Sequence, residues 1–159
     1  MAQFGGPKIV KKLHFDNTAK DKLTLGISKI ADAVSSTLGA SGKNVVIEDD
    51  FGNPHVTKDG VTVANSIMLM DPVENLGVSM MKQAAQQTAN MAGDGTTTSI
   101  VLTQAIIDCY DKLNAKEHSF RDVKNGINKF KDHVIESLEK YAIEVDDKKL
   151  NDVSIISAN

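Results

Sequence analysis

Residues 71–98 read DPVENLGVSMMKQAAQQTANMAGDGTTT, which predicts a long helix followed directly by a second one. Asp71 is a capping residue, Pro72 suits the first helical position, and Glu74 stands at the third, where its carboxylate can reach back to the cap. Gly93 supplies the positive φ that commonly ends a helix. The helix between them is expected to bury one face, formed by Val73, Leu76, Met80, Ala84 and Met91.

Apolar residues at helical spacing predict another helix on the N-terminal side of this stretch. Its buried face recurs at intervals of four, three, four and four residues and consists of Leu23, Ile27, Ile30, Val34 and Leu38. Asp16, Asn17 and Thr18 can each cap its start. Gly39 is expected to end it.

Two further helices are expected on the C-terminal side. The one that begins at Thr96 has Ile100, Val101, Ala105, Ile107, Tyr110 and Leu113 available for burial. Cys109, the single cysteine, lies in this apolar run and is interpreted as a small core residue. The last helix opens at Ser119 and carries Val123, Ile127, Phe130, Val134 and Leu138 at helical spacing.

Only short segments favour strands. Residues 44–48 and 55–57 flank a turn-rich segment and predict a hairpin, and residues 9–15 are expected to form one more short strand. Residues 61–70 are ambiguous, with helix favoured after Thr62. The predicted fold class is therefore mainly α with a small β component.

Glycines and methionines inside the expected helices call for a packing explanation. Gly26, Gly77 and Gly126 each cost a helix about 1 kcal/mol relative to alanine, which close approach of another helix can offset. The methionine-rich window 68–91 is interpreted as core or subunit interface; it contains Met68, Met70, Met80, Met81 and Met91.

Composition excludes several classes of protein. With 18 Lys plus Arg against 21 Asp plus Glu, the net charge is −3, and the basic residues are scattered, so nucleic acid is not an expected partner. No apolar run approaches the roughly 20 residues that span a bilayer, and no signal-peptide pattern opens the chain. We therefore expect no membrane partner and a cytoplasmic location.

The segment Gly93 to Thr98 is the strongest candidate for a ligand site. Two glycines allow a tight backbone path, and three threonines stand where the next helix leaves its first amides unpaired, an arrangement that attracts phosphate. Asp94 would repel phosphate directly, and makes sense there if Mg²⁺ lies between them. An ordinary helix stop followed by a threonine cap explains the same residues, and the two interpretations stay open.

Two more loops carry charged residues next to glycine. In the loop 57–60, Lys58 can neutralise phosphate oxygens and Asp59 can orient or deprotonate a water, although a simple turn has the same pattern. The loop 37–43 superficially resembles a P-loop, but it has two residues between Gly39 and Gly42 where that motif needs four.

Together these loops resemble one family closely. The order and spacing of residues 37–39, 43–46, 51–54, 57–61 and 93–98 are similar to the nucleotide-binding signatures of group I chaperonins, the GroEL-like proteins. The resemblance runs from about Phe15 to the last residues. It implies the helical bundle of a chaperonin equatorial domain, incomplete in this chain.

The resemblance also implies roles for individual residues. Thr37, Leu38, Gly39 and Ala40 would line the adenosine-phosphate side, Lys58 would meet phosphate, and Gly95, Thr96, Thr97 and Thr98 would wrap the phosphates of ATP. Asp94 would hold Mg²⁺, and Asp59 would be the catalytic carboxylate that positions the hydrolytic water. Ala40 and Ser41 depart from the family pattern, which commonly has Pro and Lys there.

For the whole protein, the resemblance implies an ATP-hydrolysing subunit that refolds unfolded polypeptides inside a homo-oligomeric ring, a double ring when complete. A GroES-like co-chaperonin is a candidate partner. Residues 1–140 would be the first half of the equatorial domain and residues 141–159 the start of an intermediate domain, with the chain truncated there. The alternative is a naturally short, non-enzymatic module that binds or modulates chaperonin rings.

Overall fold

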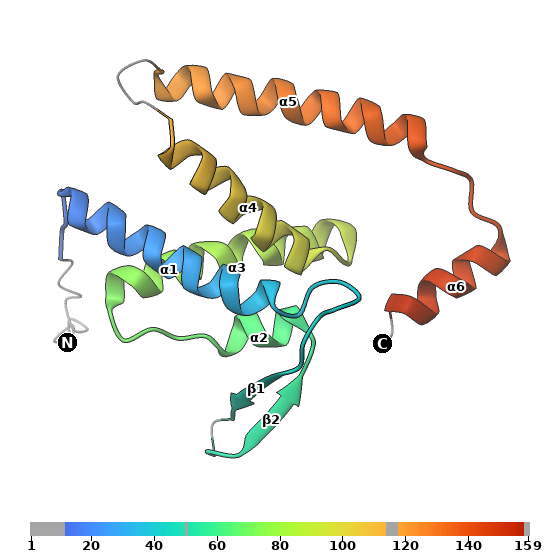
Figure 1. Ribbon diagram of the computed structural model, residues 1–159, viewed down its shortest axis with the longest axis horizontal. Helices are drawn as coiled ribbons and strands as arrows, with labels where there is room; N and C mark the ends of the chain where they lie inside the picture. The colour runs from blue at the N-terminus through green and yellow to red at the C-terminus, as the bar shows by residue number, and fades with distance from the viewer. Residues whose placement is uncertain (1–11, 50, 114–117, 158–159) are drawn as a thin grey trace, which may run out of the picture. The chain divides into compact units, whose positions relative to one another are not determined.

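The computed structural model describes residues 12–49, 51–113 and 118–157 (Figure 1). Helices predominate, and two short strands form a hairpin, so the predicted mainly α fold with a small β component is confirmed. The elements are α1 (Asn17–Ser35), β1 (Val45–Glu48), β2 (Pro54–Thr57), α2 (Gly60–Ser66), α3 (Pro72–Ala92), α4 (Thr96–Asp111), α5 (Phe120–Tyr141) and α6 (Asp147–Ser157).

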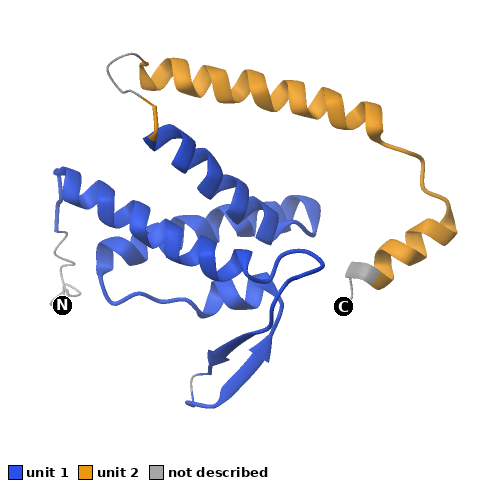
Figure 2. Ribbon diagram, viewed as in Figure 1, with its two compact units in different colours: residues 1–111 blue, residues 112–159 orange. Residues whose placement is uncertain are grey.

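The chain divides into two compact units, residues 1–111 and residues 112–159 (Figure 2). Every core residue found in the described part of the chain belongs to the first unit. The second unit contains α5 and α6. The predicted boundary near residue 140 concerns the domains of a complete chaperonin subunit and stays a prediction.

The helix starts follow the predicted capping chemistry. Asp16, Asp71 and Ser119 each accept a hydrogen bond from a backbone amide in the first turn of α1, α3 and α5. Glu74 differs from the prediction, because its carboxylate does not reach back to the cap. Its Oε2 accepts a hydrogen bond from Lys29 of α1 at 2.6 Å, since α1 runs beside α3 and offers a cation there.

The core forms where α1 packs on α3, with α2 and α4 completing it. Glycine makes the close crossing of α1 and α3 possible. A Cβ atom at Gly26 would lie 2.0 Å from the Glu74 carbonyl oxygen, and one at Gly77 would lie 2.4 Å from the Leu23 carbonyl oxygen. The packing interpretation holds for these two glycines, whereas a Cβ atom at Gly126 would meet nothing within 4 Å.

The buried face of α3 is one residue away from the predicted face. Leu76, Met80 and Met91 are exposed, while the buried residues are Gly77, Val78, Met81 and Ala85. The reason is the crossing itself: Gly77 must face α1 for the backbones to approach, and this fixes the rotation of the helix. Among the methionines of the window, Met81 alone belongs to the core.

The burial predicted for α1 is largely confirmed, whereas that predicted for α4 is mostly wrong. In α1, Ile27, Ile30 and Val34 are buried as expected, but the helix ends before Leu38, which is half exposed. Ile100 is the one buried residue of α4. Cys109 is exposed, so its prediction as a core residue is wrong; it lies on a face of α4 turned away from the core that Ile100 joins.

The hairpin has the predicted strands, paired antiparallel with Val45 opposite Thr57 and Glu48 opposite Pro54. Residues 61–66 are helical, and α2 begins earlier than expected, at Gly60. Residues 12–15 of the predicted first strand are irregular, and residues 9–11 lie outside the described part. Gly39 has φ +78° but stands in the turn after α1, which ends at Ser35.

The second unit is helical with little burial of its own. The predicted opening of α5 at Ser119 is confirmed, but none of its residues is buried. Its apolar residues Ile127, Phe130, Ile135, Leu138 and Tyr141 are exposed by 42% or more. Within the described residues, no helix combines the length and apolar character that a membrane span requires.

Candidate functional site

Three loops that the sequence analysis singled out meet at Gly60, the first residue of α2. A Cβ atom placed there would lie 2.0 Å from Thr97 Oγ1 and 3.3 Å from Thr37 Oγ1. Thr37 follows α1 and Thr97 lies in the first turn of α4, so both hydroxyls approach the backbone at Gly60. Only glycine leaves room for this approach.

The loop after α1 is closed by its own backbone. Gly42 N–H donates to the Gly39 carbonyl at 2.9 Å and Lys43 N–H donates to the Ser36 carbonyl at 2.8 Å. Thr37 is half buried and its hydroxyl donates to the Val34 carbonyl at 2.8 Å. Leu38 and Ala40 are exposed. The loop therefore holds Thr37 beside Gly60 and presents its following residues to solvent.

Asp59 caps α2 through both carboxylate oxygens. Its Oδ1 accepts from Val61 N–H at 3.3 Å, and its Oδ2 accepts from Thr62 N–H at 3.0 Å and from the Thr62 hydroxyl at 2.5 Å. Partial burial by itself would raise the pKa of Asp59, but these hydrogen bonds outweigh it and hold the pKa below its usual value. Asp59 is therefore an anion at neutral pH that is better suited to orient a water than to take its proton.

The loop between α3 and α4 places unpaired amides beside a carboxylate. Gly93 and Gly95 have φ of +76° and +84°, and Asp94 Oδ1 accepts from Gly95 N–H at 2.6 Å. Aspartate or serine side chains cap α1, α2, α3 and α5, whereas Gly95 precedes α4 and has no side chain that could do so. The first amides of α4 are thus left for an external acceptor.

The remaining predicted residues lie around this meeting point. Lys58 precedes Asp59 and is exposed, and none of the ion pairs among the described residues involves it. Thr96 and Thr97 are half buried and Thr98 is exposed. Thr62 was not predicted as a site residue. The signal that would have found it is the spacing Asp59-x-x-Thr62, in which a hydroxyl at the third helical position can return to the capping carboxylate.

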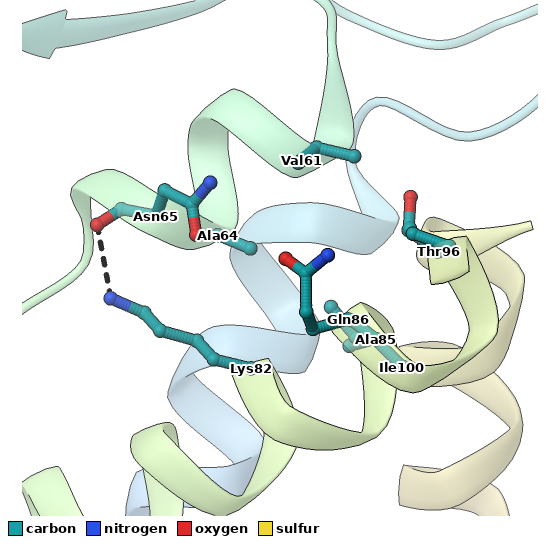
Figure 3. Close-up of a pocket in the computed structure, with 9 residues that line it drawn as sticks. Val61, Ala64, Asn65, Lys82, Ala85, Gln86, Thr96 and Ile100 are labelled. Carbon is teal, nitrogen blue, oxygen red and sulfur yellow. Dashed lines mark hydrogen bonds between the residues drawn. The ribbon is translucent and has the colours of Figure 1, made fainter. Parts of the chain in front are cut away.

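A small pocket of about 90 Å³ lies between α2, α3 and α4 (Figure 3). Lys82 of α3 points to the end of α2 there and donates to the carbonyls of Asn65 and Ile67 at 3.0 and 2.8 Å. Burial lowers the pKa of Lys82. Of the predicted nucleotide-binding residues only Thr96 lines the pocket, which is smaller than the roughly 300 Å³ or more of ligand pockets, so we place the candidate site at the loops.

The residues present suit Mg²⁺ held jointly by protein and phosphate. Asp94 is exposed, and one of its two carboxylate oxygens is engaged, by Gly95 N–H. In residues 12–49, 51–113 and 118–157, no three or more His, Cys, Asp or Glu side chains gather in a way that could hold a metal ion. Mg²⁺ commonly binds one or two carboxylates together with phosphates and water. Asp94 offers the carboxylate, and the uncapped first amides of α4 beside it can hold the phosphates.

Comparison with known families decides where the chain belongs. Residues 30–159 match the TCP-1/cpn60 chaperonin family, and this range contains all three loops. The chain is a member of that family. The resemblance to group I chaperonins is thereby confirmed.

Two curated relatives of this chaperonin chain come from plants. Chaperonin 60 subunit beta 3, chloroplastic, of Arabidopsis thaliana is 46% identical over 156 residues, which cover 96% of this chain and 26% of the relative. The RuBisCO large subunit-binding protein subunit beta, chloroplastic, of Pisum sativum is 44% identical over 152 residues, covering 94% and 26%. The chain spans about a quarter of the length of these relatives.

The fold of this chaperonin chain has a match among solved structures. The chaperonin gp146 of bacteriophage EL (Pseudomonas aeruginosa), crystallised in the presence of ATP-BeFx, superposes with a TM-score of 0.69 at 34% identity, over 80% of this chain and 22% of gp146. The helical bundle resembles that of a chaperonin equatorial domain, as predicted. The predicted cytoplasmic location is wrong, because both plant relatives are chloroplastic.

Proposed function

We propose that this chain carries the nucleotide-binding part of a protein-folding chaperonin subunit that binds and hydrolyses Mg-ATP. The observation that supports it best is the meeting of three loops at Gly60, where Thr37 and Thr97 approach the residue next to Asp59. The third of these loops, residues 93–98, contains the exposed Asp94 and the uncapped first amides of α4. The crystallisation of gp146 with ATP-BeFx adds support from a structural neighbour.

In this proposal each loop contacts a different part of the nucleotide. Residues 37–40 line the adenosine-phosphate side, and the amides and hydroxyls of residues 95–98 surround the phosphates. Lys58 neutralises phosphate charge. Asp94 and the phosphates are all negatively charged, and Mg²⁺ bound between them would offset their repulsion.

Asp59 acts on the water in this proposal and does not hold the nucleotide. Its carboxylate is ionised at neutral pH and fixed at the start of α2 by backbone amides. It accepts a hydrogen bond from the water that attacks the terminal phosphoryl group and so fixes the direction of attack. Nucleotide binding and hydrolysis therefore depend on different carboxylates, Asp94 and Asp59.

The wider assembly is part of the same proposal. As a chaperonin subunit, the complete protein would form a homo-oligomeric ring, bind unfolded polypeptides and work with a GroES-like co-chaperonin. The exposed apolar face of α5 is consistent with further packing in such an assembly. Native mass spectrometry of the complete protein tests ring formation, and a refolding assay with and without co-chaperonin tests the other two partners.

Titration calorimetry with ATP, in the presence and absence of Mg²⁺, tests the proposal on the complete protein. We expect Mg-dependent binding by the wild type. Asp59→Asn should bind within about threefold of wild type and lose at least about 100-fold in turnover, because it removes only the acceptor for the water. Asp94→Asn should instead weaken the dependence of binding on Mg²⁺.

The two carboxylate variants control for each other, since both replace an exposed aspartate by its isosteric amide near the start of a helix. Undiminished turnover by Asp59→Asn would remove this residue from the reaction. Absence of ATP binding by a folded wild-type protein would contradict the proposed function. It would favour the alternative of a non-enzymatic module, which predicts binding to chaperonin rings without nucleotide.

A further inference from the structure

The hydrogen bonds of Asp59 are distributed unequally between its two carboxylate oxygens. Oδ2 accepts two bonds from Thr62, one from the amide at 3.0 Å and one from the hydroxyl at 2.5 Å. Oδ1 accepts a single, longer bond of 3.3 Å from Val61 N–H. Because an ionised carboxylate offers about four acceptor positions, two on each oxygen, Oδ1 keeps one position for a further donor, whereas both positions of Oδ2 are occupied.

The backbone on both sides of Asp59 is held by contacts of its own. Asp59 N–H donates to the Thr57 hydroxyl at 3.1 Å, and the next residue, Gly60, lies against Thr97 and Thr37. The amides of Val61 and Thr62 restrain the carboxylate but leave one acceptor position on each oxygen. The half-buried Thr62 hydroxyl occupies the second position of Oδ2 and adds a further restraint on rotation about the side-chain bonds.

We propose that Thr62 is a positioning residue for Asp59: its hydroxyl fixes Oδ2 and leaves Oδ1 as the oxygen that meets the water. The inference rests on the proposed function and adds a residue to it. Charge-assisted hydrogen bonds are shorter and stronger than neutral ones, and the 2.5 Å bond is the shortest at Asp59. An amide cap alone would hold α2 without selecting which carboxylate oxygen stays free.

Thr62→Val keeps the shape of the side chain and removes the hydroxyl, and Thr62→Ser keeps the hydroxyl. In the complete protein, we expect Thr62→Val to lower kcat about tenfold with KM for ATP changed less than about twofold, and Thr62→Ser to restore most of kcat. Removing a donor to the ionised form raises the pKa of Asp59, so the acid limb of the kcat profile should move to higher pH in Thr62→Val.

Two controls separate positioning from folding. Thr103→Val removes a half-buried hydroxyl that donates to the Ser99 carbonyl at 2.8 Å within α4, and should leave kcat and its pH profile unchanged. In an Asp59→Asn background, Thr62→Val should cause no further loss, because both changes act through the same carboxylate. A Thr62→Val protein with wild-type kcat and an unmoved acid limb would overturn the inference.

A spectroscopic measurement makes the inference independent of ATP turnover. The carboxyl carbon of Asp59, followed by carbon-13 NMR against pH, should titrate at higher pH in Thr62→Val than in wild type or Thr62→Ser. An unchanged titration contradicts the role of Thr62 even where ATP is hydrolysed. If Thr62→Val shifts the titration of Asp59 but the wild-type protein binds no ATP, the role of Thr62 is supported and the proposed function is contradicted. Thr62→Ala provides the same comparison where the valine variant does not fold.

Discussion

At the scale of single residues, the ion pair between Lys22 and Asp71 makes a prediction about acid stability. The Lys22 ammonium, followed by the amides of Val73 and Glu74, lowers the pKa of Asp71 from 3.8 to about 2. As the pH falls, the Asp71 carboxylate therefore takes up a proton near pH 4 in the unfolded chain and only near pH 2 in the folded chain. The stabilisation is complete above about pH 4 and is lost as the pH falls towards 2.

Asp71→Asn should flatten this part of the pH dependence, since asparagine still caps α3 but does not titrate. Chemical unfolding at several pH values between 5 and 2 should show wild type losing stability more steeply than the variant. Lys22→Met is the matched control: it removes the ammonium, keeps the capping carboxylate, and should also reduce the slope. Equal slopes in all three proteins would contradict the prediction.

Helix caps could be predicted from the sequence because they depend on neighbouring residues only. The cap at Asp71 and the opening of α5 at Ser119 follow from residue type and position, because a capping side chain contacts amides two or three residues away. For α1 the sequence narrowed the cap to three residues, of which Asp16 is the one observed. Glu74 was not predictable in the same way. Its choice between the cap and Lys29 depends on where α1 lies, which no local pattern contains.

At the scale of elements, the crossing of α1 and α3 predicts the effect of adding one methyl group. Gly26→Ala and Gly77→Ala would each place a Cβ atom against a backbone carbonyl of the facing helix, at 2.0 and 2.4 Å. Backbone cannot move aside as a side chain can, so we expect each variant to lose about 1–3 kcal/mol of unfolding free energy. Thermal or urea unfolding measures this loss.

Gly126→Ala is the control that the chain itself offers. It adds the same methyl group inside a helix, α5, where nothing lies within 4 Å, and helix propensity predicts a gain of up to about 1 kcal/mol. A loss at Gly126 as large as at Gly26 would show that the effect is not due to the crossing. Stable Gly26→Ala and Gly77→Ala variants would contradict the close approach of α1 and α3.

The same crossing explains which element-level predictions succeeded. Helix positions and the hairpin follow from spacing and turn residues, but the inward face of α3 was missed by one residue. Apolar side chains occur on both candidate faces, with Leu76 and Met80 on one and Val78 and Met81 on the other, so periodicity does not choose between them. Gly77 does choose, and its significance appears only once α1 is in place.

At the scale of the whole molecule, residue patterns predicted three separate loops, and only the resemblance to group I chaperonins implied that the loops share one nucleotide site. Glycines, threonines and charges identified each loop separately. Their meeting at Gly60 depends on α2 packing against α1 and α4, which is tertiary information. Thr62 was missed for a related reason, because its hydroxyl has a clear role only when Asp59 has one.

The uneven distribution of burial over the whole chain predicts uneven protection from hydrogen exchange. The core residues of the described part belong to residues 1–111, whereas α5 has no buried residue. In the 159-residue chain, we expect amides of α5 to exchange at least about 100-fold faster than those around Val78 and Met81 of α3, because local opening of α5 exposes little apolar surface. Helix length does not account for the difference, since α3 has 21 residues and α5 has 22. Hydrogen exchange read out by mass spectrometry measures both helices in one experiment, and equal protection of α5 and α3 in a monomeric sample would contradict the prediction.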